Sequence, residues 1–218
     1  MRPNRLPREL TWSDAFRFPV STPQARRDIV TGGLIVVLFL LVGWILNLGN
    51  RLNVVARLYR GEEPVFRGFS PWVHTFRRGC VSFAAIALYL SPSALFAAIA
   101  ILLKARGMEL PHWPFAVASA LAFGLAVFTL PGGMTVYACE ADLTVLRDPR
   151  RAFERAWNQR GPYFKAWRIS ILSVALSLLG LLVFGIGFAF TSVWCWEVVG
   201  YAFTVAMYMD ATPDETRR

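Results

Sequence analysis

Long apolar segments alternate with shorter polar ones along this chain. The apolar stretches occupy residues 29–48, 80–103, 115–138 and 169–209. A helix needs about 20 apolar residues to cross the roughly 30 Å hydrocarbon core of a bilayer, so the first three stretches predict one helix each and the last predicts two. Gly185 and Gly187 mark the expected turn within the last stretch. The pattern predicts an all-α, polytopic integral membrane helix bundle.

Basic residues are distributed unevenly between these stretches. Lys and Arg number six before residue 29, six in 49–79, two in 104–114, seven in 139–168 and two after 209. Short basic loops stay in the cytoplasm during insertion. Five crossings would split these charges 8 against 15, whereas a first segment that enters and returns would split them 21 against 2. We therefore expect four spanning helices and a re-entrant first hairpin, broken near residues 43–47, with five spanning helices as the alternative.

This topology predicts a multi-pass protein of the cell (cytoplasmic) membrane with both termini in the cytoplasm. The expected organisation is a basic, aromatic N-terminal segment (residues 1–28), a single membrane domain (29–209) and a polar C-terminal tail (210–218). Composition agrees, because 56% of residues are hydrophobic and only 17% are charged. The net charge of +9 is expected to attract anionic lipid headgroups rather than nucleic acid, since the arginines lie beside apolar spans and aromatic residues.

Two polar segments predict interfacial amphipathic helices. In residues 50–60 apolar side chains share one face, and Gly61 ends the helix. In residues 149–159, Asp148 is the expected N-cap and Pro149 the first helical residue. The basic residues expected to face lipid or a protein partner in the membrane are Arg51, Arg57, Arg60, Arg147, Arg150, Arg151 and Arg155.

Three positions inside apolar stretches are predicted helix breaks: Gly43, Pro92 and Pro131. At the prolines the favoured interpretation is a kink whose freed carbonyl bonds a neighbouring hydroxyl, and the alternative is unwound backbone around a transported solute. A stripe of small residues, Ala116, Ala120 and Gly124, predicts a close approach of helices.

Glu197 is the candidate intramembrane polar site. It lies ten residues after Gly187, which is about 15 Å into the final span and near the bilayer midplane. A charged carboxylate there costs roughly 3 kcal/mol, so we expect Glu197 to point into the bundle and to be protonated, hydrogen-bonded to Ser or Tyr hydroxyls, or in contact with water.

The chain resembles a family of small archaeal and bacterial membrane proteins catalogued as domain of unknown function 4013. The resemblance rests on glycines at 32, 33 and 49, on Arg60-Gly61-Glu62, on Pro71-Trp72, and on Arg78-Gly79 leading to Tyr89 and Pro92. Members often carry a proline in the middle of the first segment, where Gly43 stands here. The resemblance implies a membrane location and a first hairpin, and it implies no chemistry.

Catalytic motifs are lacking: the sequence has no phosphate-binding loop, nucleophile elbow or zinc-binding helix. His74 and His112 fall in different loops, so no metal or other cofactor is expected. The expected function is a non-catalytic membrane scaffold or subunit with a basic face that binds lipid or a partner. The alternative is a small-solute or proton transporter or channel component that uses Glu197, and a membrane enzyme acting on lipids comes third.

Overall fold

The computed structural model describes residues 6–7, 9–63 and 65–209, so the predicted tail at 210–218 lies outside the described residues. Helices form throughout the described part, and no strand occurs in it. Five helices are long and apolar enough to cross a membrane, which confirms the predicted all-α membrane fold. In chain order the elements are α1 (Trp12–Arg17), η1 (Phe18–Val20), α2 (Pro23–Arg60), α3 (Trp72–Ala105), α4 (Glu109–Glu140), α5 (Thr144–Arg147), α6 (Pro149–Asn158), α7 (Arg160–Leu178), η2 (Leu179–Leu182) and α8 (Ile186–Tyr208).

The long helix α2 doubles back on itself at Phe39, the one residue within it whose backbone is not helical (φ −133°, ψ 41°). The amide of Asn47 donates to the carbonyl of Gly32 at 3.1 Å. In a straight helix, residues 15 apart would be separated by about 22 Å, so the two arms must run antiparallel. The first apolar segment therefore folds back on itself, as a re-entrant hairpin requires.

The break in α2 was predicted at Gly43, and this position is wrong. Gly43 is helical, and its lack of a side chain lets the two arms touch, because a Cβ there would lie 2.5 Å from the carbonyl oxygen of Ile35. Asn47 also lies within the return arm, where its amide donates to Gly43. Nothing in the local sequence distinguishes Phe39 from its apolar neighbours as the turning point.

Neither Pro92 nor Pro131 ends its helix. The hydroxyl of Ser91 donates to the carbonyl of Leu88 at 2.8 Å, which is the group that Pro92 leaves without its helical donor. One residue beyond Pro131, the Tyr163 hydroxyl from α7 accepts from the amide of Gly132 at 3.2 Å and donates to the carbonyl of Phe128. At Pro92 a hydroxyl bonds the freed carbonyl as expected, whereas Pro131 frees the carbonyl of Val127 and the Tyr163 hydroxyl bonds the neighbouring carbonyl instead.

Close helix contact occurs at other glycines than the predicted stripe. Gly124 faces open space. Instead, α2 and α3 meet at Gly49 and Gly79, where an added Cβ would collide with the backbone of Thr75 and of Ile45. Small residues therefore do let helices approach closely, as predicted, but they stand at other positions than the predicted stripe.

Residues 50–60 do not form an interfacial helix. They are the return arm of the α2 hairpin, and most of them are buried, including Leu52 and Val55 in the core shared with α3 and α4. The predicted helix at residues 149–159 agrees better with the structure. In α6 the Asp148 side chain accepts from the amide of Arg150, Pro149 opens the helix, and one face is buried while the arginines are exposed.

Helices α7 and α8 form a second hairpin that turns at Gly185, whose positive φ of 74° is readily adopted only by glycine. The hydroxyl of Thr191 donates to the carbonyl of Ser177 at 2.7 Å and joins the two helices near the turn. The turn is apolar, and Phe184 at its tip is 97% exposed. Gly185 was predicted to mark this turn, and the structure confirms it.

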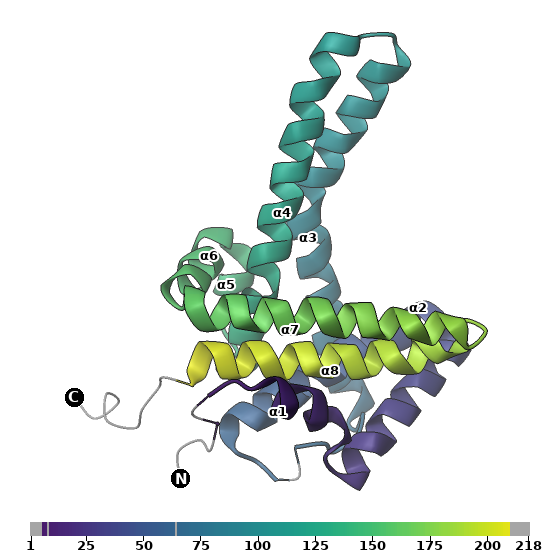
Figure 1. Ribbon diagram of the computed structural model, residues 1–218, viewed down its shortest axis with the longest axis vertical. Coiled ribbons are helices and arrows are strands. Elements are labelled where there is room, and N and C mark those ends of the chain that lie inside the picture. Colours follow the sequence, from purple (N-terminus) through teal and green to yellow (C-terminus); the bar gives the residue numbers. More distant parts are fainter. Residues whose placement is uncertain (1–5, 8, 64, 210–218) are drawn as a thin grey trace.

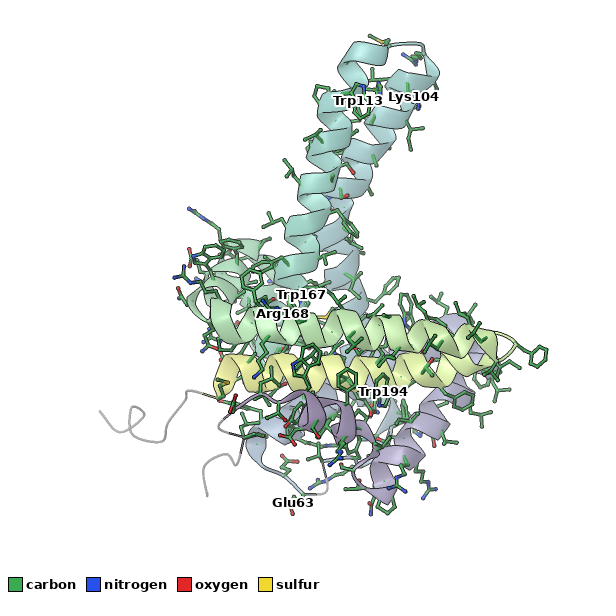
Figure 2. All side chains as sticks on the ribbon, in the orientation of Figure 1. Glu63, Lys104, Trp113, Trp167, Arg168 and Trp194 are labelled. Carbon is green, nitrogen blue, oxygen red and sulfur yellow. The ribbon has the colours of Figure 1, made fainter. Side chains whose placement is uncertain are left out.

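Figure 1 shows the α3–α4 pair extending away from the rest of the molecule, while α7 and α8 run across its base. Glu63, in the segment after α2, lies at the end opposite Lys104 and Trp113 (Figure 2). The α5–α6 region and the N-terminal α1 also lie near the base, and α1 packs on α8 through Phe16 and Trp194. The basic segments therefore gather away from the α3–α4 turn.

Candidate lipid-facing and buried polar sites

The exposed face of α6 and the preceding α5 carries four arginines at the base of the molecule. Arg147 and Arg150 are exposed and form no ion pair with the described residues. Arg151 lies 3.5 Å from Asp148. Trp157, about half exposed, stacks on Phe153 at 5.7 Å. An aromatic ring beside unpaired arginines is the composition typical of a surface that contacts anionic headgroups.

Arg155 has a different role from its three neighbours. Its guanidinium donates to Glu140 at the end of α4, and the same carboxylate oxygen accepts from the Tyr208 hydroxyl of α8 at 2.7 Å. Burial alone would lower the pKa of Arg155, but the hydrogen bond and charge of Glu140 outweigh it and raise the pKa. Arg155 therefore ties α6 to the ends of two membrane helices.

The arginines of α2 that were predicted to lie on the surface also differ from one another, in this case in their exposure. Arg60 is exposed and lies 3.6 Å from Glu62. Arg57 is half-buried. Arg51 is 5% exposed, so its assignment to the lipid-facing surface is wrong. The hydrophobic pattern of the segment did not reveal this, because Arg51 fits the polar side of an amphipathic helix whether that side meets water or other helices.

Glu197 points into the bundle, where it is 3% exposed. Neither carboxylate oxygen has a hydrogen-bond partner among the described residues, so the predicted Ser or Tyr hydroxyls of that part do not bond it. It lines a small cavity of about 10 Å³ with Asn47, Asn50 and Arg51 of α2 and with Val193 and Trp196 of α8. That volume is close to the minimum for a single water molecule.

The side-chain carbonyl oxygens of Asn47 and Asn50 are left without hydrogen-bond donors by the described residues. The amide nitrogen of Asn47 is used by the carbonyls of Gly32 and Gly43, at 3.1 and 2.9 Å, which fixes the orientation of the amide. The amide nitrogen of Asn50 lies 3.5 Å from the Asp28 carboxylate. The Oδ1 atoms of both asparagines are buried and accept from none of the described residues, so together with Glu197 they form a cluster of acceptors.

A larger groove of about 530 Å³ lies beside the base of the α2 hairpin. Arg27, Asp28, Arg67 and Trp72 are among its lining residues. Since Asp28 also contacts Asn50, a line of polar side chains leads from this groove toward the Glu197 cavity. Sequence reasoning missed Asp28 and the three α2 residues around Glu197, because only the fold of the hairpin brings them together.

The two histidines lie at opposite ends of the antiparallel α3–α4 pair. His74 is in the first turn of α3, and His112, near the start of α4, packs on Trp113 at 4.9 Å. Across the residues that the structure describes, no group of three or more His, Cys, Asp or Glu side chains is placed to hold a metal ion.

Comparison with protein families, with curated proteins and with solved structures finds no match to this chain. The resemblance to the domain of unknown function 4013 therefore stays a prediction. The helices themselves identify an integral membrane protein, since five of them combine sufficient length with sufficient hydropathy to cross a bilayer.

Proposed function

We propose that this protein is a non-catalytic component of the cell membrane, a scaffold or subunit whose basic face holds anionic lipid or a membrane partner. The observation that carries this proposal is the α5–α6 surface, where Arg147 and Arg150 are exposed beside Trp157 without ion pairs to described residues. Each such arginine is attracted to an anionic leaflet by about 1 kcal/mol. In this proposal the base of the molecule faces the cytoplasm, and so do both termini.

The exposed apolar surface of α3 and α4 supports a role inside the bilayer. Beyond the base, side chains such as Ile101 and Leu121 are exposed on the pair. Apolar surface of this extent is covered by lipid chains or by another membrane protein, because water would leave it unstable.

The test removes the two unpaired arginines, Arg147→Gln with Arg150→Gln, in the full-length protein purified in mild detergent. Retained anionic lipid, measured by mass spectrometry, is expected to fall about thirtyfold at low salt, following about 1 kcal/mol for each of the two arginines. The difference should shrink as salt is raised. The matched control is Lys104→Gln with Arg106→Gln at the α3–α4 turn. Equal lipid retention by the two double variants and the wild type would exclude lipid binding by this face.

A second candidate function, transport of protons or a small cation, rests on the buried acceptor cluster of Glu197, Asn47 and Asn50. The discriminating variants are Glu197→Gln, which keeps shape and hydrogen bonding, and Glu197→Leu. If proton flux into liposomes disappears in the Gln variant while its assembly is intact, the site is a transport site. If there is no flux in the wild type, and Leu alone disrupts assembly, Glu197 is structural.

A further inference from the structure

An apolar pocket of about 400 Å³ lies where the α3–α4 pair crosses α7 and α8. Its walls are apolar side chains from these four helices, including Leu130, Met134 and Val174. The exposed Val174 places one wall at the outer surface of the molecule. This volume falls within the range of small-molecule sites, which combine an apolar lining with a few polar groups.

The polar groups that border this pocket without a partner are both hydrogen-bond donors. Arg51 lines it, and its buried Nε atom has no hydrogen-bond partner in the part of the chain that the structure describes. The guanidinium lies 5.2 Å from the centre of the Trp196 ring, which covers one of its faces. Trp167 also lines the pocket, and its buried indole Nε1, which lies near the Tyr163 hydroxyl, forms no well-aligned hydrogen bond with the described residues. Neither group can accept a hydrogen bond, so only a ligand with acceptor atoms satisfies them.

Both donors lie at the same level of α8. The Cγ and Nε atoms of Arg51 come within 3.4 and 3.5 Å of the place where a Cβ on Gly200 would stand. Ser173 meets Cys195 at 3.4 Å, and Tyr163 meets Phe203 with ring centres 5.0 Å apart. This antiparallel register places Trp167 beside the same part of α8 as Gly200. Arg51 and Trp167 therefore line the pocket at the same level along α8.

Comparison with Arg78 shows that Arg51 lacks the usual compensation for burial. Arg78, which is less buried, donates to Asn53 at 2.9 Å and to the carbonyl of Ala138 at 3.3 Å. Arg51 has no acidic group of the described residues within 4.0 Å, although it shares the small cavity with Glu197. An uncompensated buried charge costs several kcal/mol, and a bound anion removes that cost.

We propose that this pocket binds a single-chain anionic lipid, with its hydrocarbon chain against the apolar walls and its carboxylate or phosphate oxygens on Arg51 and Trp167. Arginine suits this role because its planar guanidinium matches two oxygens of a carboxylate or phosphate. The inference rests on the proposed role of the protein as a lipid-binding membrane component. Its site is separate from the α5–α6 surface, so the two can be tested apart.

The experiment uses tryptophan quenching in the full-length protein in detergent, because Trp167 and Trp196 both line the pocket. The probes are a dibrominated C18 fatty acid and the dibrominated alcohol of the same chain, at a pH where the acid is ionised. The acid is expected to quench at a concentration at least tenfold lower than the alcohol. Arg51→Met should remove this preference, while Arg51→Lys should retain part of it.

Two further variants make the result decisive if Arg51→Met does not fold. Val174→Phe narrows the pocket from its exposed wall without touching Arg51 and should weaken quenching by both probes. Glu197→Gln should leave acid binding intact, because Glu197 is not the partner of Arg51. Equal quenching by acid and alcohol in the wild type, or unchanged acid binding in a folded Val174→Phe protein, overturns the inference.

The double variant at Arg147 and Arg150 separates this inference from the proposed function. It should lose retained bulk anionic lipid and keep the acid preference in quenching. If it instead abolishes the acid preference while Arg51→Met preserves it, the α5–α6 surface is the lipid site and the pocket is not.

Discussion

Replacing Gly79 by alanine should weaken the packing of α3 against the α2 hairpin. A Cβ at this position would lie 2.8 Å from the carbonyl carbon of Ile45 and closer still to its oxygen. The obstacle is backbone, which has no rotamer to move, so the two helices must separate by roughly 1 Å to restore ordinary contact. Overpacking of this kind costs about 1–3 kcal/mol. Alanine recovers up to about 1 kcal/mol as the better helix former, so we expect a net loss of up to about 2 kcal/mol.

The matched control is Gly124→Ala in α4, where the added methyl group meets nothing within 4 Å. Only the gain in helix propensity remains there, so this variant should be more stable by up to about 1 kcal/mol. Both free energies of unfolding are measured by titrating SDS into the protein in mild detergent and following tryptophan fluorescence. The two variants are expected to shift in opposite directions. If both stabilise the protein, the close contact of α2 and α3 at Gly79 is wrong.

Two further predictions concern the polar ends of the molecule. Single cysteines at Arg67, Arg106 and Arg155 in a cysteine-free background should react with an impermeant thiol reagent in intact cells only at position 106; labelling of 67 or 155 would contradict the shared cytoplasmic face. The hydrogen bonds that Asp142 accepts from the hydroxyl and amide of Thr144 lower the pKa of its carboxyl, so its stabilisation of the α5 start is present above about pH 4 and lost as the pH falls below that value. Amide exchange of Thr144 should therefore speed up below pH 4, relative to its intrinsic rate, in the wild type but not in Asp142→Asn, and equal pH dependence in both would remove Asp142 as the cause.

Hydropathy, charge distribution and helix-capping residues predicted much of the fold. The apolar stretches gave the five long helices, the arginine count gave the returning path of the first segment, and Asp148 with Pro149 gave the start of α6. These features depend on local sequence or on counts, so no knowledge of tertiary contacts is needed. The residue at which the segment turns back was missed because nothing in the local sequence marks Phe39. Gly43 looks like a helix break, but it is a glycine because the two arms touch there.

The candidate sites were less accessible from the sequence. Glu197 was found because a single acid in an apolar stretch stands out. Arg51 was placed on the surface because the pattern of an amphipathic helix cannot tell lipid headgroups from neighbouring helices. Its burial, and its meeting with Trp196 and Gly200 of α8, follow from how the α2 hairpin packs, which involves residues about 150 positions apart in the chain.

The apolar turns of two hairpins have a consequence for biosynthesis. No charged residue lies between Asp28 and Arg51, and none lies between Arg168 and Glu197. In the proposed topology both hairpins can therefore enter the bilayer tip first from the side on which the chain is made, without carrying a charge through the hydrocarbon. In that topology only the turn between α3 and α4, with Lys104 and Arg106, requires charged residues to be translocated. The demand on the insertion machinery is thus concentrated in one short segment near the middle of the chain.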